Sequence, residues 1–286
     1  MSDPRDALDA IGQLPDVEID LAGAAVQLAR IDTPDLDWQA ATEHLSELAR
    51  GAIDLARDLP STDLSARAGA LARLITGQYR YAGDTENYDS PENANLIQVT
   101  LRRRGLPVAL GILWLHCARS AGWGAHGVDF PGHFLVALEG ENTSKRSRAP
   151  ERRQTVVDVF AGGVPLDGRD MGALLKRIEG NEAELRPGVL QPLSSRNVLL
   201  RLQNNIRSRR QAADDLPGAL ACIEDMLRIA PDTAPLWREA ALLNQQLDHI
   251  GTALQCYERY LKLVPDGDTA FRTRAAIDAL RSKHNR

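Results

Sequence analysis

Two residues of this chain have the types, and the order along the sequence, that acid–base chemistry requires. His133 stands alone in the segment FPGHFLVALEG, and Asp158 follows in TVVDVFAGG. An imidazole that a carboxylate orients can take up and release a proton near neutral pH. Upstream lies RGLPVALGILWLHCARSAG, in which Pro107 opens an apolar stretch with helical character. A helix start, then a histidine, then an aspartate is the chain order of one large class of cysteine-nucleophile enzymes.

A thiol enzyme of that class needs three groups from three separate elements. A thiolate lies at a helix N-terminus, where unpaired amides stabilise negative charge, a histidine transfers the proton, and a carboxylate or amide orients the histidine. Here the expected helix start carries Pro107. Proline has no nucleophilic side chain, so a covalent acyl-enzyme cannot form at that position.

The elements that must position these residues follow from the pattern of apolar side chains. The segment 107–121 is apolar almost all round, which predicts a helix buried in the centre of a domain. Pro107 suits its first turn and Gly122 its C-terminal stop. The runs HGVDF, HFLVALE and QTVVDVF are rich in Val and Phe and alternate in part. They predict antiparallel strands that carry His133 and Asp158.

Other segments frame this core. Helical spacing between Ile19 and Arg57 predicts one or two amphipathic helices, and a third carries apolar residues from Leu64 to Ile75. The polar segment YRYAGDTENYDSPENANL then favours turns. The basic cluster SKRSRAPERR, residues 144–153, predicts a solvated loop between two strands.

Composition limits the classes of function. The chain has 286 residues, of which 43% are hydrophobic, so it can bury a large core. A formal net charge of −5 gives no overall cationic field for nucleic acid or an acidic membrane surface. The three cysteines are odd in number and lack paired spacing, which favours a reducing, cytoplasmic setting. No apolar run predicts a membrane helix. We expect no cofactor and no metal, because His126, His133 and Asp158 match no compact ligand motif.

The C-terminal third of the chain changes to a purely helical pattern with an internal repeat. Pro231 and Pro265 are 34 residues apart, and Ala219 and Ala253 each lie twelve residues before their proline. A 34-residue period with small, aromatic and proline positions in this order resembles the tetratricopeptide repeat, with Trp237 at its early aromatic position. Two copies predict a short helical array.

The segments RRRGLPVAL, FPGHFLV and DVFAGG together resemble the transglutaminase-like core of the bacterial invasion-regulator group, in which such a core precedes tetratricopeptide repeats. The resemblance covers most of the chain from about Ile19 onward. It implies an α+β fold, namely a transglutaminase-like (papain-like cysteine-proteinase) domain with a helical N-terminal part and an antiparallel sheet, followed by an all-α tetratricopeptide-type domain. We place the first domain at residues 10–188 and the second at residues 192–286.

The resemblance also assigns the site residue by residue. Active enzymes of these families carry Gly-x-Cys at the helix start and a glycine near the end of that helix. Gly-Leu-Pro ending at Pro107 and Gly122 occupy those places here, while His133 matches the catalytic histidine and Asp158 the orienting aspartate. Cys117 lies ten residues further along the helix, about 15 Å away at about 1.5 Å per residue. It cannot replace the nucleophile by the same geometry.

The retained pair allows three interpretations: a structural hydrogen-bonded pair, a binding cleft, or residual catalysis through a metal or a bound water. Asn93 and Asn95 in SPENANL could line such a cleft as amide donors, or could cap a helix and hold a turn. The leading hypothesis is a pseudoenzyme, a regulatory module that binds a protein or peptide through its cleft and its helical repeats. The alternative is a hydrolase or acyl transferase in which His133 and Asp158 act with a non-cysteine nucleophile or a bound water.

Overall fold

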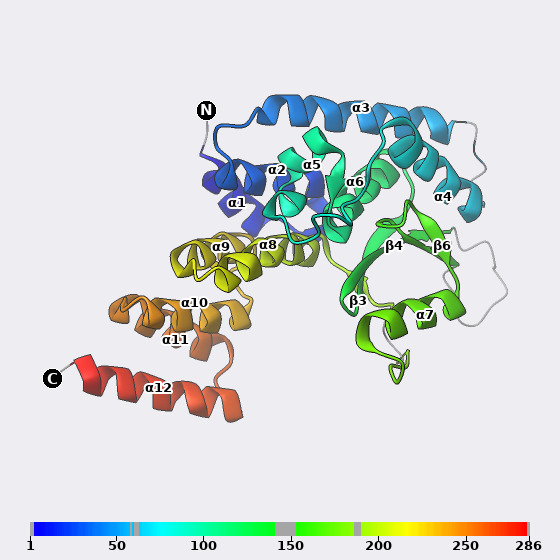
Figure 1. Cartoon of the computed structure of the whole chain (residues 1–286). Coiled ribbons are helices and arrows are strands. Elements are labelled where there is room, and N and C mark those ends of the chain that lie inside the picture. Colours follow the sequence, from blue (N-terminus) through cyan, green and yellow to red (C-terminus); the bar gives the residue numbers. More distant parts are fainter. Residues whose placement is uncertain (1–2, 58, 60–62, 141–152, 186–189, 285–286) are drawn as a thin grey trace. The chain divides into compact units, whose positions relative to one another are not determined.

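The computed structural model describes residues 3–57, 59, 63–140, 153–185 and 190–284 (Figure 1). Nearly all of the basic cluster predicted to form a loop, residues 144–152, lies outside these ranges. The chain forms two compact units, one of residues 15–202 and one of residues 1–14 together with 203–286. Within the described ranges, no helix is both long and apolar enough to cross a bilayer.

Helices dominate the first half of the unit formed by residues 15–202. Five of the unit's described helices begin at a side chain that accepts a hydrogen bond from a first-turn amide, the usual role of Asp and Asn at an N-cap; these are Asp20, Asp37, Asp63, Asn95 and Asp167. In chain order the helices are η1 (Asp16–Glu18), α2 (Leu21–Asp32), α3 (Trp38–Ala56), α4 (Leu64–Ala72), the π-helix η2 (Arg73–Gln78), η3 (Pro91–Ala94), α5 (Leu96–Arg102), α6 (Pro107–Ser120) and α7 (Gly168–Glu179). The segment before Arg57 therefore contains two long helices, α2 and α3.

One five-stranded antiparallel sheet follows the central helix, in the order β6-β5-β4-β3-β7. The three predicted runs form β3 (Ala125–Phe130), β4 (His133–Glu139) and β5 (Gln154–Asp158). Two short edge strands complete the sheet, β6 (Val164–Leu166) and β7 (Pro192–Leu193), and a separate parallel pair joins β1 (Ala82–Gly83) to β2 (Arg104–Gly105). The turn between β3 and β4 holds Gly132 at φ +63°, a conformation that glycine adopts without steric penalty.

The sheet lies between two helical layers (Figure 1). Successive side chains of a strand point to opposite faces, so β4 contacts both layers. Leu135 and Ala137 pack in one cluster with Met171, Leu174 and Leu175 of α7. Phe134 faces the other way, toward α6, where a Cβ on Gly111 would lie only 2.2 Å from its ring. All side chains of α6 except His116, Arg119 and Ser120 are buried, which confirms the prediction of a central helix.

The second unit is built from helices. The C-terminal part of α8 (Ser195–Ala212), from Gln203, is followed by α9 (Leu216–Ile229), α10 (Ala234–Gln246), α11 (Ile250–Leu263) and α12 (Asp268–His284). Equivalent positions of the two copies are buried: Ala219 and Ala253, which helped to predict the repeat, and with them Ile223 and Met226 in α9 and Tyr257 and Tyr260 in α11. The 34-residue period therefore reflects helix pairs that pack through equivalent positions.

An N-terminal helix, α1 (Pro4–Gln13), also belongs to this helical unit. At Gly12 its backbone approaches α9 so closely that a Cβ would lie 2.1 Å from the carbonyl oxygen of Arg228. Arg5 Nε bonds to Asp225 Oδ1 at 2.9 Å, and Arg228 pairs with Asp9 at 2.6 Å. No periodicity in the sequence indicated this contact.

Candidate functional site

His133 and Asp158 lie close together because they stand at the same end of two neighbouring strands. His133 is the first residue of β4 and Asp158 the last residue of β5, and these strands pair antiparallel. The His133 Nε2 atom lies 2.9 Å from Asp158 Oδ1. Their side chains are only 11% and 7% exposed, so the pair is largely shielded from solvent.

The loop after β5 fixes the Asp158 carboxylate. Its Oδ1 atom also accepts hydrogen bonds from the backbone amides of Phe160 and Ala161, at 3.0 and 3.2 Å. Gly163, at φ +85°, closes the loop by donating its amide to the Asp158 carbonyl. Burial raises the pKa of Asp158, but the hydrogen bonds from His133 and the two amides outweigh it, and the net pKa lies below the usual value. The carboxylate is therefore ionised at neutral pH.

The ionised carboxylate determines the state of the imidazole. A carboxylate only accepts hydrogen bonds, so Nε2 of His133 carries the hydrogen and Nδ1 is left as the nitrogen that can accept a proton. Among the described residues, Nδ1 has no hydrogen-bond partner. The Phe160 ring lies edge-on to the imidazole, with 6.1 Å between ring centroids. This arrangement can hold a proton or remove one from a group placed beside Nδ1.

The structure places no nucleophile at the helix start. Pro107 is the first residue of α6 and is buried. Cys117 lies in the interior of the same helix with no exposed surface, and burial raises the pKa of its thiol to about 12. A thiol in such surroundings stays protonated and unreactive near neutral pH. Cys117 is a core residue.

Two family models match this chain. Residues 40–204 match the model of the transglutaminase-like superfamily, and residues 206–278 match a tetratricopeptide-repeat model. The chain belongs to the transglutaminase-like superfamily. A UPF0162 protein of Pseudomonas aeruginosa is 30% identical over 86% of this chain and 84% of the relative. A UPF0162 protein of Xylella fastidiosa is 29% identical over 84% and 82%, respectively.

Among solved structures, a crystal structure of menin with its binding site for the Mixed Lineage Leukemia protein covers 99% of this chain and 71% of that chain. The TM-score is 0.39 and the sequence identity 13%. A likeness at this level bears on no functional question.

The two asparagines predicted as cleft residues are buried in the transglutaminase-like unit and hydrogen-bond within it. Asn93 donates its amide to the Asn87 carbonyl at 2.7 Å and accepts from Arg102 at 3.0 Å. Asn95 caps α5 by accepting from the Gln98 amide, and it donates to the Ala29 carbonyl. These bonds favour the capping and turn-holding interpretation over ligand binding.

The other histidines near the sheet also have partners of their own. His126 Nδ1 lies 2.7 Å from Glu139 Oε1, and His116 Nε2 lies 2.9 Å from the Leu45 carbonyl. No three His, Cys, Asp or Glu side chains gather as a metal site in the described parts of the chain.

One residue beside the pair had no signal in the sequence. Arg201 of α8 donates to the His133 carbonyl, pairs with Asp129 of β3, and lies over the Phe134 ring with its guanidinium carbon 5.8 Å from the centroid. The sequence placed this segment beyond the catalytic domain, within the helical repeat region. Only its tertiary position links it to the site.

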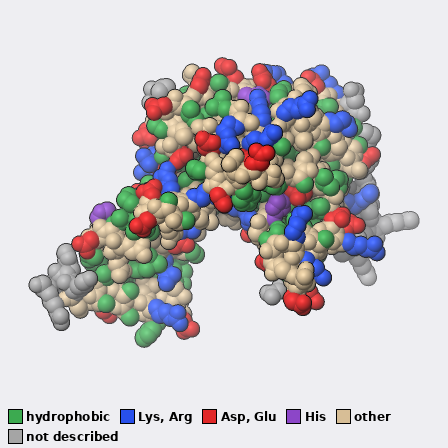
Figure 2. All heavy atoms as spheres, viewed as in Figure 1, with side chains coloured by type: hydrophobic (Ala, Val, Ile, Leu, Met, Phe, Trp, Pro, Cys, Tyr) green, Lys and Arg blue, Asp and Glu red, His purple; other side chains and the backbone are tan. Residues whose placement is uncertain are grey.

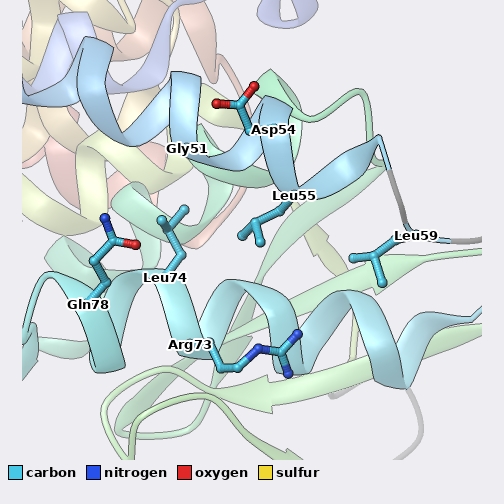
Figure 3. A pocket seen from close by; sticks show the side chains of 7 residues that line it. All are labelled: Gly51, Asp54, Leu55, Leu59, Arg73, Leu74 and Gln78. Carbon is cyan, nitrogen blue, oxygen red and sulfur yellow. The ribbon is translucent and has the colours of Figure 1, made fainter.

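Two pockets lie apart from the pair. One, of about 730 Å³, is lined by residues of α1, α9, α10 and α11, together with Pro231. The other, of about 540 Å³, lies between α3 and the α4–η2 segment (Figure 3). We refer to them as the repeat pocket and the π-helix pocket.

Proposed function

We propose that this protein is a non-catalytic transglutaminase-like protein that binds a protein or peptide partner, chiefly through its helical repeats. The observation that carries the proposal is the repeat pocket, in a unit whose repeat class presents binding surfaces to other proteins. Pro107 at the nucleophile position supports the absence of acyl transfer. The surface beside His133 is a second contact region in this proposal.

The repeat pocket combines apolar side chains with charged ones. Leu227, Ala240 and Trp237 supply apolar surface, and the Trp237 ring is fixed by a 2.8 Å hydrogen bond from Nε1 to the Pro231 carbonyl. Ring and leucine surfaces of this kind anchor apolar side chains of a peptide.

The charged residues of the repeat pocket differ in whether they form an ion pair with another described residue. Its two arginines already pair with carboxylates, Arg228 with Asp9 and Arg259 with Asp232. Glu224 is exposed and makes no ion pair within the described part of the chain. The expected ligand is a peptide that places Lys or Arg next to an apolar side chain.

The same proposal assigns a cellular role. Both relatives are bacterial proteins, and the order of a transglutaminase-like core before tetratricopeptide repeats is that of the invasion-regulator group. We place the protein with those regulators, in the cytoplasm, as a module that acts by binding. Nucleic acid is a poor candidate partner, since acidic and basic side chains are interspersed over the visible face (Figure 2) and the net charge is −5.

Selection from a random peptide library by the purified full chain tests the binding role. We expect enrichment of sequences with a basic residue beside an apolar one, and loss of that enrichment with Glu224→Lys. The matched control is Asp278→Lys, which reverses an exposed charge on α12 away from the pocket. Selection that yields no common motif, or a motif that Glu224→Lys leaves unchanged, would contradict the proposal.

A second candidate function is an esterase, amidase or acyl transferase that uses His133 as base for a bound water or a substrate hydroxyl. The specific observation in its favour is the ionised Asp158 that orients His133 and leaves Nδ1 without a partner. Turnover of a panel of acyl esters and amides tests it. Activity that His133→Ala abolishes and His249→Gln in the helical unit retains would establish this function, and absence of turnover would exclude it for these substrates.

A further inference from the structure

The π-helix pocket has a composition that the proposed binding role does not use. Seven residues line it: Gly51, Asp54 and Leu55 of α3, then Leu59, and Arg73, Leu74 and Gln78 of η2. It lies in the transglutaminase-like unit, and it shares no residue with the repeat pocket or with the His133–Asp158 pair.

Two local features border this pocket. Gly51 has no side chain, and a Cβ there would lie 2.9 Å from Leu74 Cδ1. The opposite wall is a π-helix, in which the amide of Tyr79 donates to the Leu74 carbonyl at 3.0 Å. A helix-weakening glycine faces a rare helical form that is frequent at functional sites.

The interior of the pocket is apolar. Figure 3 shows Leu55, Leu59 and Leu74 pointing into the space between the two helices. Leu74 is buried, whereas Leu55 and Leu59 are only partly covered. Aliphatic surface that the fold leaves partly open is available to an aliphatic ligand.

The rim of the pocket carries one charge without a partner among the described residues. Arg73 is exposed, and its guanidinium has no hydrogen bond or ion pair to any described residue. The acidic residue of the rim, Asp54, instead pairs with Arg57 at 3.1 Å, and its side chain points away from the pocket in Figure 3. Gln78 lies on the other side of Leu74 from the Arg73 guanidinium in Figure 3, and its amide borders the opposite end of the pocket.

We propose that the π-helix pocket binds an aliphatic monocarboxylate, with the chain on the leucines and the carboxylate on Arg73. The planar guanidinium matches a carboxylate through two parallel hydrogen bonds. Among the described lining residues, Arg73 is the one arginine or lysine, which suits one negative charge better than the two of a phosphate monoester. A volume of about 540 Å³ lies in the usual range for small-molecule sites. The carboxylate can come from a free fatty acid or from the C-terminus of an apolar peptide.

Calorimetric titration of the full chain with two probes tests the site and separates these sources. The probes are octanoate and acetyl-trileucine with a free carboxylate, and their controls are octanol and the amidated tripeptide. We expect Arg73→Gln to weaken binding of the active probe about tenfold, the effect of losing one charge-assisted contact at a partly solvated site. Gly51→Leu, which fills the pocket between the helices, should abolish binding.

Matched variants keep the test specific. Arg50→Gln removes an exposed arginine of α3 that does not line the pocket, so it should bind as the unmodified chain does. Thermal melts of all variants separate loss of binding from loss of fold. Binding of octanoate alone identifies a fatty-acid type of ligand, and binding of the tripeptide acid alone identifies a peptide C-terminus. The proposal fails if neither probe binds at millimolar concentrations, if octanol binds as well as octanoate, or if Arg73→Gln leaves the affinity unchanged.

Discussion

The His133–Asp158 pair and the two pockets differ in how the fold uses their charged groups. Asp158 is buried and accepts three hydrogen bonds, from the His133 ring and from the amides of Phe160 and Ala161. Arg73 and Glu224 are exposed, and neither makes an ion pair within the described ranges. The first group holds two strands and a loop together, whereas the other two are charges that the fold leaves available to ligands.

The buried pair and the exposed charges therefore differ in what can keep them in the chain. A buried pair whose partners are all supplied by the protein is retained whenever its loss would unfold the site, whether or not a reaction takes place there. An exposed charge at the rim of an apolar pocket has no such structural reason to persist. Stability measurements should therefore respond to the pair, and binding measurements to the rims of the pockets.

The largest expected effect is on stability, at Asp158. We expect Asp158→Ala to lower the free energy of unfolding by about 3–5 kcal/mol, because it leaves the His133 ring and two loop amides without their acceptor. Asp158→Asn keeps an oxygen in place and should cost less. Urea denaturation of both variants beside Asp278→Ala, an exposed control on α12, measures the difference. A loss for Asp158→Ala no greater than for the control would mean that the pair is not structural.

The second expected effect is on the reactivity of a thiol placed at position 107. If the pair still faces the start of α6, Pro107→Cys places a thiol where the helix N-terminus and His133 lower its pKa. We expect alkylation by iodoacetamide at pH 7 about tenfold faster than for an ordinary thiol. The native cysteines give little background, because burial raises the pKa of Cys117 to about 12 and of Cys256 to about 11.

The rate in Pro107→Cys with His133→Ala is the control for that experiment. If the double variant reacts as fast as Pro107→Cys alone, His133 does not activate a thiol at the start of the helix. If both variants are alkylated at the rate of an ordinary thiol, the role of the pair is structural only.

The pH dependence of stability provides a subtler test of the pair. The folded-state pKa of Asp158 lies below the usual 3.8, so its contribution is complete above that value and is lost as the pH falls through the folded-state pKa. The stability difference between the unmodified chain and Asp158→Asn should be largest at neutral pH and shrink toward pH 3. Urea midpoints across this range give the difference. A gap that stays constant with pH would show that the ionised carboxylate is not what stabilises the loop.

The elements around the pair could be predicted because their patterns are local. The all-round apolar segment from Pro107 could only be a buried helix, and alternating Val and Phe runs placed His133 and Asp158 on strands. The 34-residue period likewise repeats a packing pattern that neighbouring helices share. Short strands such as β7 (Pro192–Leu193) escaped prediction because two residues carry no periodicity and this segment is rich in proline.

Features that depend on contacts distant in sequence could not be predicted. Arg201 reaches the His133 carbonyl across 68 residues, and α1 packs on α9 through Gly12 near Arg228. The pockets belong to the same class, since Gly51 and Arg73 become neighbours only when α3 and η2 pack. Arg73 and Glu224 are ordinary charged residues in the sequence, and what distinguishes them is that neither forms an ion pair with another described residue.

The smallest expected effect is therefore the stability change at the pocket rims. Arg73→Gln and Glu224→Lys should each alter the free energy of unfolding by less than about 0.5 kcal/mol, as exposed substitutions without partners do. Arg228→Gln is the contrasting variant, because it breaks the ion pair with Asp9 and its contact with the buried Asp225. It should destabilise the helical unit measurably in the same urea titration. If Arg73→Gln or Glu224→Lys costs as much as Arg228→Gln, that charge has a structural partner, and its pocket loses the free group on which ligand recognition depends.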